Sequence, residues 1–416
     1  MADNRYAYRK LLILNMIYHL GPISRTELVA LTDYRPATVG DIVTDLLQEK
    51  LVVEAGQASA GHGRKRVMLE MNRTHLCALG ISFLSGSVQY VLGQPDGQLL
   101  HRSETPMEEG ISRSILADRI TEEVKSILDA FADKNIVGIG ICNPLCDPRS
   151  YQAAESLSTS YAHFNDWICD GLKPRLAALS GLRVQTFSNV TLPVVAEHRF
   201  GVAKDAEDFL WVELSNGIGA SIFASGNAIG GARGVAGELG HTVINSQDQA
   251  LCYCGKPGCV ERTCAFPALV TQIRQALDNG VFSLLRRRAK VPEQISVEDI
   301  RWALEQGDRM CLHLVENAAE QIGIAIANAV NLLNPKLVVL YGFMLELGEH
   351  FLKPLEHAIR ENTITLAEDF EIRLSTSLES LLPLGAVAEL FSEYLASENY
   401  RWVYRLTPAD TEEKEN

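Results

Sequence analysis

A short polar segment, residues 237–261, carries the side chains of this sequence that are best placed to do chemistry together. It reads GELGHTVINSQDQALCYCGKPGCVE and contains one histidine, three cysteines and two glutamates. Cys252 and Cys254 are separated by one residue, and two glycines let the chain turn back sharply before Cys259. Three thiolates and one imidazole make the closed tetrahedral set that structural zinc prefers, with no position left for a catalytic water. The predicted ligands of this structural Zn²⁺ are His241, Cys252, Cys254 and Cys259.

Two other interpretations of these cysteines compete with the zinc site. The first is a group of reduced thiols without a metal, which the spacing and the two intervening glycines disfavour. The second replaces one ligand by Cys264. That residue lies five positions after Cys259 in an apolar, helical pattern, so packing in a hydrophobic core suits it better.

The same segment resembles the signature of the ROK family, which comprises bacterial sugar-responsive repressors and sugar kinases. The residues that carry the resemblance are GELGH at 237–241 and CYCGKPGCVE at 252–261, and weaker matches run from about residue 10 to residue 395. The resemblance implies that Glu238, His241 and Glu261 line a sugar pocket, with His241 also bound to zinc. Carboxylates accept hydrogen bonds from neighbouring hydroxyls, and a metal would order the loop before the ligand arrives.

Length and charge indicate the domain organisation of the chain. A chain of 416 residues exceeds one ordinary core and predicts two or three domains, and 47% hydrophobic with 22% charged residues is typical of soluble globular proteins. The net charge is −14, but residues 1–74 hold ten Lys+Arg against eight Asp+Glu, a balance of +2 that leaves −16 for the remainder. This asymmetry predicts a small head that faces nucleic acid on an acidic body.

No membrane insertion is expected, because no stretch approaches the roughly 20 apolar residues of a membrane span. The amino terminus lacks the basic start and apolar run of a signal peptide. Nine cysteines, several in apolar surroundings, favour a reducing compartment, and we therefore predict a cytoplasmic protein.

Residues 1–72 predict a winged helix-turn-helix domain. Helical spacing over 9–20 is followed by Ser24 and Glu27, which form a capping-box pattern before a short helix. Pro36 suits the first position of a third helix, whose apolar residues recur on one face. Two strands then flank a glycine-rich loop that ends in a basic triplet. The alternative is a small helical domain for protein contacts with a solvated run of charge.

The predicted DNA contacts come from the third helix and from the basic loop, or wing. Small residues at the start of the helix allow close approach to a major groove, and a basic loop can enter a minor groove or contact phosphates. ROK repressors carry such a head and ROK kinases generally lack it, although their wing usually reads Gly-Arg-Pro where this chain has Gly-Arg-Lys at 63–65. The candidate contacts are Arg35, Ala37, Thr38, Thr44, Arg64, Lys65 and Arg66.

Residues 73–395 predict an α/β body, and residues 396–416 a C-terminal extension. Repeated strand–strand–helix and strand–helix–strand patterns favour two similar lobes around a cleft. The resemblance identifies this as the actin-like ATPase, or sugar-kinase, fold. Strands are predicted within 77–91 and at 136–141, 183–187, 209–214, 220–224 and 337–340, and helices at 111–132, 191–200, 310–333 and 382–395.

Three places decide between a kinase and a sensor. ROK kinases hold ATP phosphates on an Asp-x-Gly-Gly-Thr turn, where this chain reads SFLSG at 82–86. They place an Asn-Asp pair after the mid-body strand, whose aspartate removes the proton of the sugar hydroxyl, whereas this chain has Asn189-Val190. Valine cannot accept a proton, and loss of a general base typically costs about 100- to 10,000-fold in rate. The glycine turn at 217–219 matches, but hairpins need glycines anyway. The sequence therefore predicts no enzyme activity.

The sequence as a whole predicts a transcriptional regulator that represses carbohydrate-related genes. It would bind a double-stranded DNA operator as a homodimer or homotetramer and respond to a sugar-type effector in the interlobe cleft. Two alternatives are a ROK sugar kinase with an added DNA-binding head and a regulator controlled by a partner protein rather than a sugar. The predicted effector-binding residues are Asn189, Glu238, His241 and Glu261.

Overall fold

The computed structural model describes most of the chain. The described residues are 2–58, 66–84, 86–108, 110–143, 164, 166–232, 234–245, 251–288, 295–367, 369–375 and 381–395. Arg64 and Lys65 of the predicted wing, Ser85 of the first body hairpin and the predicted extension 396–416 lie outside them. None of the described helices combines the length and apolar character that crossing a membrane requires.

The amino-terminal part is a winged helix-turn-helix. Its helices are α1 (Ala2–Leu20), α2 (Arg25–Thr32) and α3 (Pro36–Gln48), and its strands are β1 (Ile23–Ser24), β2 (Val52–Ala58) and β3 (Arg66–Met71). The strands pair in the order β1-β3-β2. The capping box at Ser24 and Glu27 forms as predicted, and Pro36 opens α3. Apolar faces of α1 and α3 meet in a core that includes Ile13, Ile17 and Ile42.

The first lobe of the body is built on a five-stranded sheet in the order β6-β5-β4-β7-β8. Its strands are β4 (Leu76–Leu84), β5 (Ser87–Gly93), β6 (Leu99–Pro106), β7 (Asn135–Asn143) and β8 (Val184–Ser188). One face packs against α4 (Arg113–Ala130), η1 (Trp167–Leu172) and α6 (Lys173–Ser180). The other face carries α13 (Leu381–Leu395), the last helix described. Strand β6 was not predicted, because its residues are mostly half-exposed or exposed at the sheet edge and show little hydrophobic pattern.

The second lobe repeats this plan with a sheet in the order β11-β10-β9-β12-β13. Its strands are β9 (Phe209–Leu214), β10 (Ile218–Ala224), β11 (Asn227–Ile229), β12 (Leu337–Tyr341) and β13 (Glu371–Leu374). Helix α7 (Leu192–Phe200) covers one face. The other face is covered by α8 (Val260–Cys264), α9 (Phe266–Asp278), α10 (Val297–Glu305), α11 (Arg309–Leu333) and α12 (Glu349–Glu361). Short turns of 3-10 helix complete the lobe: η2 (Leu239–His241), η3 (Leu284–Arg287), η5 (Phe343–Leu347) and η6 (Thr365–Ala367).

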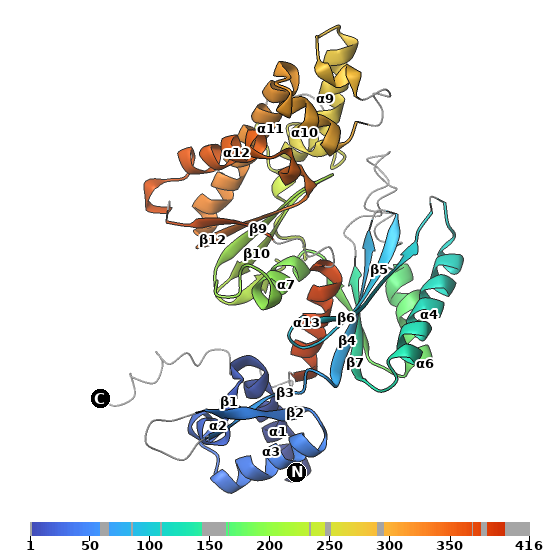
Figure 1. Cartoon of the computed structure of the whole chain (residues 1–416), viewed down its shortest axis with the longest axis vertical. Helices are drawn as coiled ribbons and strands as arrows, with labels where there is room; N and C mark the ends of the chain where they lie inside the picture. Colours follow the sequence, from blue (N-terminus) through green and yellow to red (C-terminus); the bar gives the residue numbers. More distant parts are fainter. Residues whose placement is uncertain are drawn as a thin grey trace.

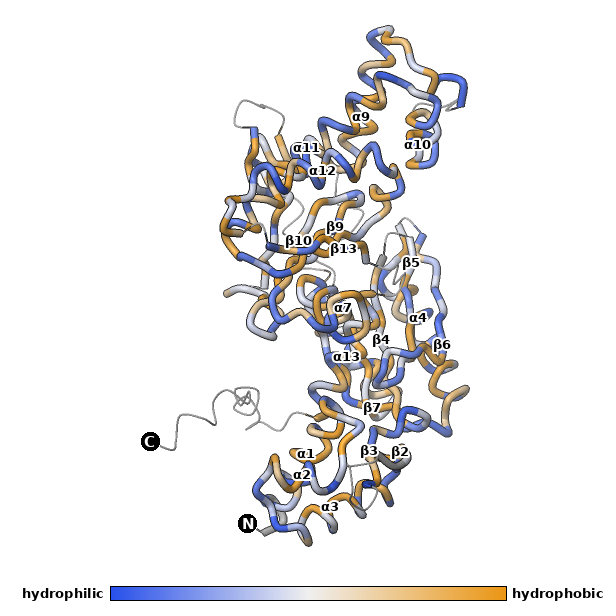
Figure 2. Tube along the Cα trace, turned by 60° about the vertical axis from the view of Figure 1, so that its left-hand side comes forward, coloured by the Kyte–Doolittle hydropathy of each residue, from blue (hydrophilic) through white to orange (hydrophobic). Residues whose placement is uncertain are grey.

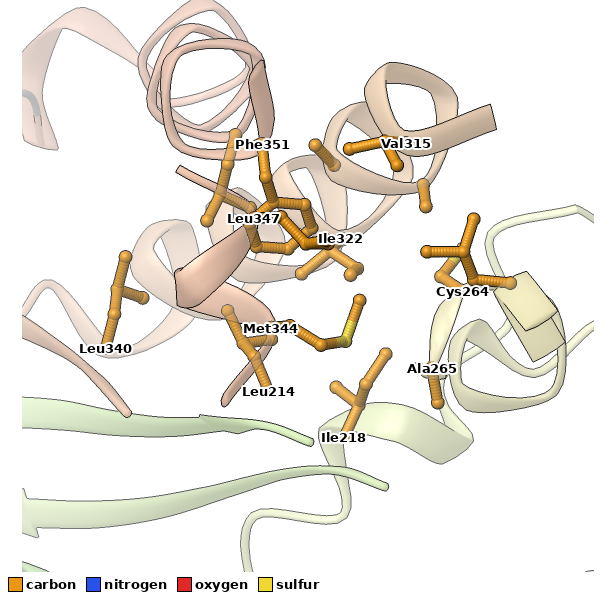
Figure 3. Packing of buried hydrophobic residues seen from close by; sticks show 14 of the residues in the cluster. Leu214, Ile218, Cys264, Ala265, Val315, Ile322, Leu340, Met344, Leu347 and Phe351 are labelled. Atoms are coloured by element: carbon orange, nitrogen blue, oxygen red, sulfur yellow. The ribbon is translucent and has the colours of Figure 1, made fainter. Parts of the chain in front are cut away.

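The core of the second lobe takes in Cys264, the rival metal ligand. This thiol is fully buried, and it lies among apolar side chains that include Val315 and Ile322 of α11 (Figure 3). The preference for core packing at this position is therefore confirmed.

Helix α13 joins the three parts of the molecule. Although it comes last in the described chain, it lies between the winged head and α7, with the first sheet along its side (Figures 1 and 2). Val387, Leu390 and Phe391 belong to the same hydrophobic cluster as the core of the head. The buried Asn15 amide on α1 also donates a hydrogen bond of 3.1 Å to the carbonyl of Leu395. The head is thus packed onto the body through the carboxy-terminal helix.

Glycines allow α13 to approach its neighbours closely. A Cβ at Gly80 of β4 would lie 2.0 Å from the carbonyl oxygen of Pro383, and a Cβ at Gly385 would lie 2.5 Å from that of Leu192 at the start of α7. Both distances are far below van der Waals contact with a rigid backbone atom. The strand, α13 and α7 therefore stack at a spacing that no residue with a side chain permits.

We expect Gly385→Ala to destabilise the protein, although glycine-to-alanine changes inside helices usually stabilise by up to about 1 kcal/mol. Overpacking of this kind typically costs about 1–3 kcal/mol. Gly40→Ala in α3 is the matched control, because a Cβ there meets nothing within 4 Å. Thermal unfolding should show a lower midpoint for Gly385→Ala and an equal or higher midpoint for Gly40→Ala. An unchanged midpoint for Gly385→Ala would contradict the tight crossing.

Candidate functional site

The structure brings the four predicted metal ligands together. The ligand atoms of His241, Cys252, Cys254 and Cys259 all lie within 4.8 Å of one another. His241 Nδ1 is 3.6 Å from Cys252 Sγ, and the sulfurs of Cys254 and Cys259 are also 3.6 Å apart. A tetrahedral ion with bonds of about 2.3 Å to sulfur separates two such ligands by about 3.8 Å. The cluster therefore has the donor chemistry and the dimensions to hold a metal ion.

Two glycines form the turns that bring Cys259 back to Cys252 and Cys254. Gly255 and Gly258 have left-handed φ angles of +84° and +79°, a conformation that other residues rarely adopt. A Cβ at Gly258 would also lie 2.5 Å from the carbonyl oxygen of Asn245. The predicted role of these glycines in reversing the chain is confirmed.

Two thiols of this cluster ionise less readily than an ordinary thiol. Burial, together with the neighbouring Cys254 and Cys252 thiols, raises the pKa of Cys259 to about 12. Burial also raises the pKa of Cys252. A divalent ion reverses this preference, because metals bind thiolates and displace the protons.

The imidazole of His241 connects the metal cluster to an acidic site. Its Nδ1 faces the cysteines, while its Nε2 lies 3.6 Å from Glu238 Oε2. A metal on Nδ1 would leave the proton on Nε2, directed at this carboxylate. Burial raises the pKa of Glu238, and the nearby Glu261 carboxylate adds to the effect while His241 opposes it.

Among the predicted effector-binding residues, two buried oxygens have no hydrogen-bond partner. Glu261 Oε2 accepts a hydrogen bond of 2.8 Å from the amide of Ile218, but its Oε1 is buried without a partner. The Oδ1 atom of Asn189, in the loop between β8 and α7, is likewise buried and unpartnered. The adjacent Val190 is 5% exposed and presents only hydrocarbon. These oxygens can accept hydrogen bonds from a ligand that carries donors.

The sequence reasoning missed Glu213, at the end of β9. Burial raises the pKa of its carboxyl group, the Ser215 hydroxyl opposes the shift, and the charge of Glu261 adds to it. An acidic residue within the otherwise apolar run FLWVEL at 209–214 was the available signal. Glu213 therefore adds a third carboxyl group to the surroundings of Glu261.

The candidate DNA contacts are accessible where the structure describes them. Arg35, Ala37, Thr44 and Arg66 are exposed, and Thr38 is half-buried. The Thr44 hydroxyl donates to the Gly40 carbonyl at 2.8 Å, and Arg66 lies 3.7 Å from Glu27. Helix α1 contacts Asp45 of α3 and Glu49 directly after it, since Tyr6 donates a hydrogen bond to Asp45 and Lys10 pairs with Glu49.

The sequence profile of the ROK family matches residues 79–393. The chain belongs to the ROK family. A xylose repressor of Caldicellulosiruptor bescii is 29% identical over 396 residues, which are 94% of this chain and 97% of that protein. The transcriptional dual regulator NagC of Escherichia coli is 24% identical over 356 residues, which are 85% of this chain and 84% of NagC.

Solved structures agree with the fold. A ROK family transcriptional regulator, a homologue of the E. coli MLC protein, matches with a TM-score of 0.75 at 23% identity, and covers 93% of this chain and 96% of that chain. A ROK hexokinase from Thermus thermophilus matches with a TM-score of 0.60 at 22% identity, over 76% of this chain and 98% of the hexokinase. The predicted fold and the assignment to ROK-family transcriptional regulators are confirmed.

We expect Cys259→Ser to lose bound metal, because removal of one thiolate opens the closed ligand set. Cys264→Ala is the matched control, since Cys264 is buried outside the cluster. Elemental analysis of the purified proteins should find about one metal ion per chain in the unsubstituted protein and in Cys264→Ala, and a small fraction of that in Cys259→Ser. Equal metal in all three proteins would contradict the site.

Proposed function

We propose that this ROK-family protein is a transcriptional repressor whose winged head binds an operator and whose body binds a carbohydrate between the two lobes. The observation that carries the sugar site is the Glu261 carboxylate, which is fixed by the Ile218 amide through one oxygen and left without a donor at the other. The xylose and N-acetylglucosamine repressors among the relatives support a carbohydrate as the effector class.

The chemistry of the site suits a ligand with hydroxyl groups. A buried acceptor without a donor costs about 1–3 kcal/mol, so the site gains stability when a hydroxyl reaches it. Glu261, Asn189 and the His241–Glu238 pair offer acceptors from three separate segments. Several acceptors in fixed directions distinguish one arrangement of hydroxyls from another.

The metal in this proposal is Zn²⁺ with a structural role. The ligand set of one histidine and three cysteines supports zinc, since three thiolates suit this borderline-soft ion and close its tetrahedron. When bound, zinc would hold the Nδ1 atom of His241 and so fix the direction of Nε2 toward Glu238. The metal therefore prepares the sugar site without taking part in a reaction.

We further propose that the protein does not phosphorylate its ligand. The residue that follows Asn189 is Val190, and its buried hydrocarbon side chain cannot remove a proton from a hydroxyl. The Val190 side chain would instead face a part of the ligand that has no hydrogen-bond donor. A homodimer or homotetramer would present two heads to an operator with matching two-fold symmetry.

The wing prediction concerns Arg64 and Lys65. An operator is first selected from a random duplex library with the full-length protein. We expect Arg64→Ala/Lys65→Ala to weaken binding and to reduce the slope of log affinity against log salt by up to about 1.8, because each phosphate contact contributes about 0.9. Lys353→Ala on α12 is the control, since this exposed lysine pairs with Glu349 far from the head. Failure to select any DNA at low salt would reject the proposed DNA binding.

The effector prediction concerns Glu261. Glu261→Gln keeps an oxygen for the Ile218 amide but replaces the unpartnered oxygen by a donor. We expect the affinity for the responding sugar to fall about 10- to 150-fold, the equivalent of one charge-assisted hydrogen bond. Thermal shift with D-xylose, D-glucose and N-acetylglucosamine identifies the responding sugar, and titration calorimetry measures its affinity.

Glu346→Gln serves as the control for that experiment, because Glu346 is a surface carboxylate that lies 3.9 Å from Arg301. Its sugar affinity should match that of the unsubstituted protein. Equal affinity for Glu261→Gln would reject the assigned site. Transfer of phosphate from ATP to the bound sugar would reject the proposal that the body only senses it.

A further inference from the structure

Among the described residues, the winged head contacts both α13 and α7 of the body. The first attachment is apolar, where the core of the head continues into Val387, Leu390 and Phe391 of α13. Because α13 lies against β4, β5 and β7, this attachment belongs to the first lobe. A head attached only here would follow the first lobe.

The second attachment is polar and comes from α7. The guanidinium of Arg199 lies 3.9 Å from the centre of the Tyr18 ring and donates a hydrogen bond of 3.3 Å to the Tyr18 carbonyl. Tyr18 is in the last turn of α1, where backbone carbonyls lack partners within the helix and a positive charge is favourable. Arg199 therefore caps the end of α1.

Helix α7 belongs to the second lobe. Its residues Val194 and Ala196 pack against Phe209 and Trp211 of the second sheet. The fully buried carboxylate of Glu197 accepts hydrogen bonds from the Ser375 hydroxyl, after β13, and from the Val202 amide. These contacts attach α7 to the second sheet, while Leu192 at its start packs against Ala386 of α13.

The beginning of α7 lies at the proposed sugar site. Asn189, with its unpartnered oxygen, and Val190 directly precede the helix. Asn189 thus lies just before the first turn of this short helix, and Arg199, which contacts the head, lies in its last turn. Between them the helix crosses α13 at the Leu192–Gly385 contact, where the two lobes meet.

We propose that the Arg199–Tyr18 contact transmits effector binding from the second lobe to the DNA-binding head. Any rotation of the second lobe about the α7–α13 crossing changes the position of Arg199 relative to a head that is packed on the first lobe. The displaced end of α1 then acts on α3, because Ile13 and Ile17 of α1 share a core with Ile42 of α3. This inference rests on the proposed function, since it requires that a sugar and an operator bind.

The charge of Arg199 is well suited to this role. Burial, with Arg199 and His198, lowers the pKa of His19 to about 4, and burial lowers the pKa of His198. Both shifts favour the neutral imidazole, so the guanidinium of Arg199 is the cation that lies over the ring of Tyr18. Arg199 is a positioning residue and touches neither ligand.

The test compares the operator dissociation constant with and without a saturating amount of the responding sugar, chosen from D-xylose, D-glucose and N-acetylglucosamine. We expect Arg199→Met to reduce the ratio of the two constants by about 2- to 30-fold, the range over which residues away from both ligands alter coupling. Tyr18→Phe keeps the ring and should keep the ratio, whereas Tyr18→Leu should reduce it.

Arg360→Met is the matched control. The Arg360 guanidinium also lies over an aromatic ring, 5.3 Å from the centre of the Phe370 ring, but this contact stays within the second lobe and does not involve α7. Its ratio should equal that of the unsubstituted protein. An unchanged ratio in Arg199→Met, with sugar and operator both bound, would overturn the proposal.

A second readout separates this proposal from the proposed function. Hydrogen exchange of the free proteins should show faster exchange across residues 10–20 of α1 in Arg199→Met than in Arg360→Met. If the unsubstituted protein responds to no sugar, the proposed function fails. The hydrogen-exchange comparison alone then tests whether the Arg199–Tyr18 contact stabilises the end of α1. Equal exchange in the two variants would overturn the coupling proposal in that case.

Discussion

The orientation of one imidazole ring underlies the rest of the site. His241 presents Nδ1 to three cysteine sulfurs and Nε2 to Glu238, so one side chain belongs to a metal cluster and to an acidic site. Two apolar residues of the loop around it, Val243 and Leu251, are exposed, so burial of these side chains does not order the loop. A metal bound by these four side chains would supply the order that a hydrophobic core supplies elsewhere.

Close backbone contacts explain how that local order can affect the whole molecule. Gly80 and Gly385 place α13 against a strand on one side and against α7 on the other, with carbonyl oxygens where side chains would normally lie. Contacts between backbones cannot adapt by changing rotamers, so a movement of α7 must turn about α13 or displace it. The hydrophobic core of the head continues into α13, so a displacement of α13 also displaces the head.

The sequence predicted the parts of the structure that depend on local patterns. The capping box at Ser24 and Glu27, the turns at Gly255 and Gly258, and the clustering of His241 with three cysteines each follow from a short spacing with one physical explanation. Strand β6 was not predicted, because its residues at the sheet edge are mostly half-exposed or exposed and show little hydrophobic pattern. The Arg199–Tyr18 contact joins residues separated by 181 positions, and nothing in the local sequence of either residue indicates the other. Long-range polar contacts of this kind require the fold before they can be recognised.

The energies of the Arg199–Tyr18 contacts are comparable to the coupling free energy between two ligand sites. Coupling between two ligand sites typically amounts to about 1–3 kcal/mol. A partly desolvated cation over an aromatic ring contributes about 1–2 kcal/mol, and a hydrogen bond from a charged donor contributes about 1.5–3 kcal/mol. Arg199 makes one contact of each kind with Tyr18, so loss of this single attachment is enough to account for a regulatory response. The apolar attachment to α13 is larger and would survive, which leaves the head folded and docked while its orientation changes.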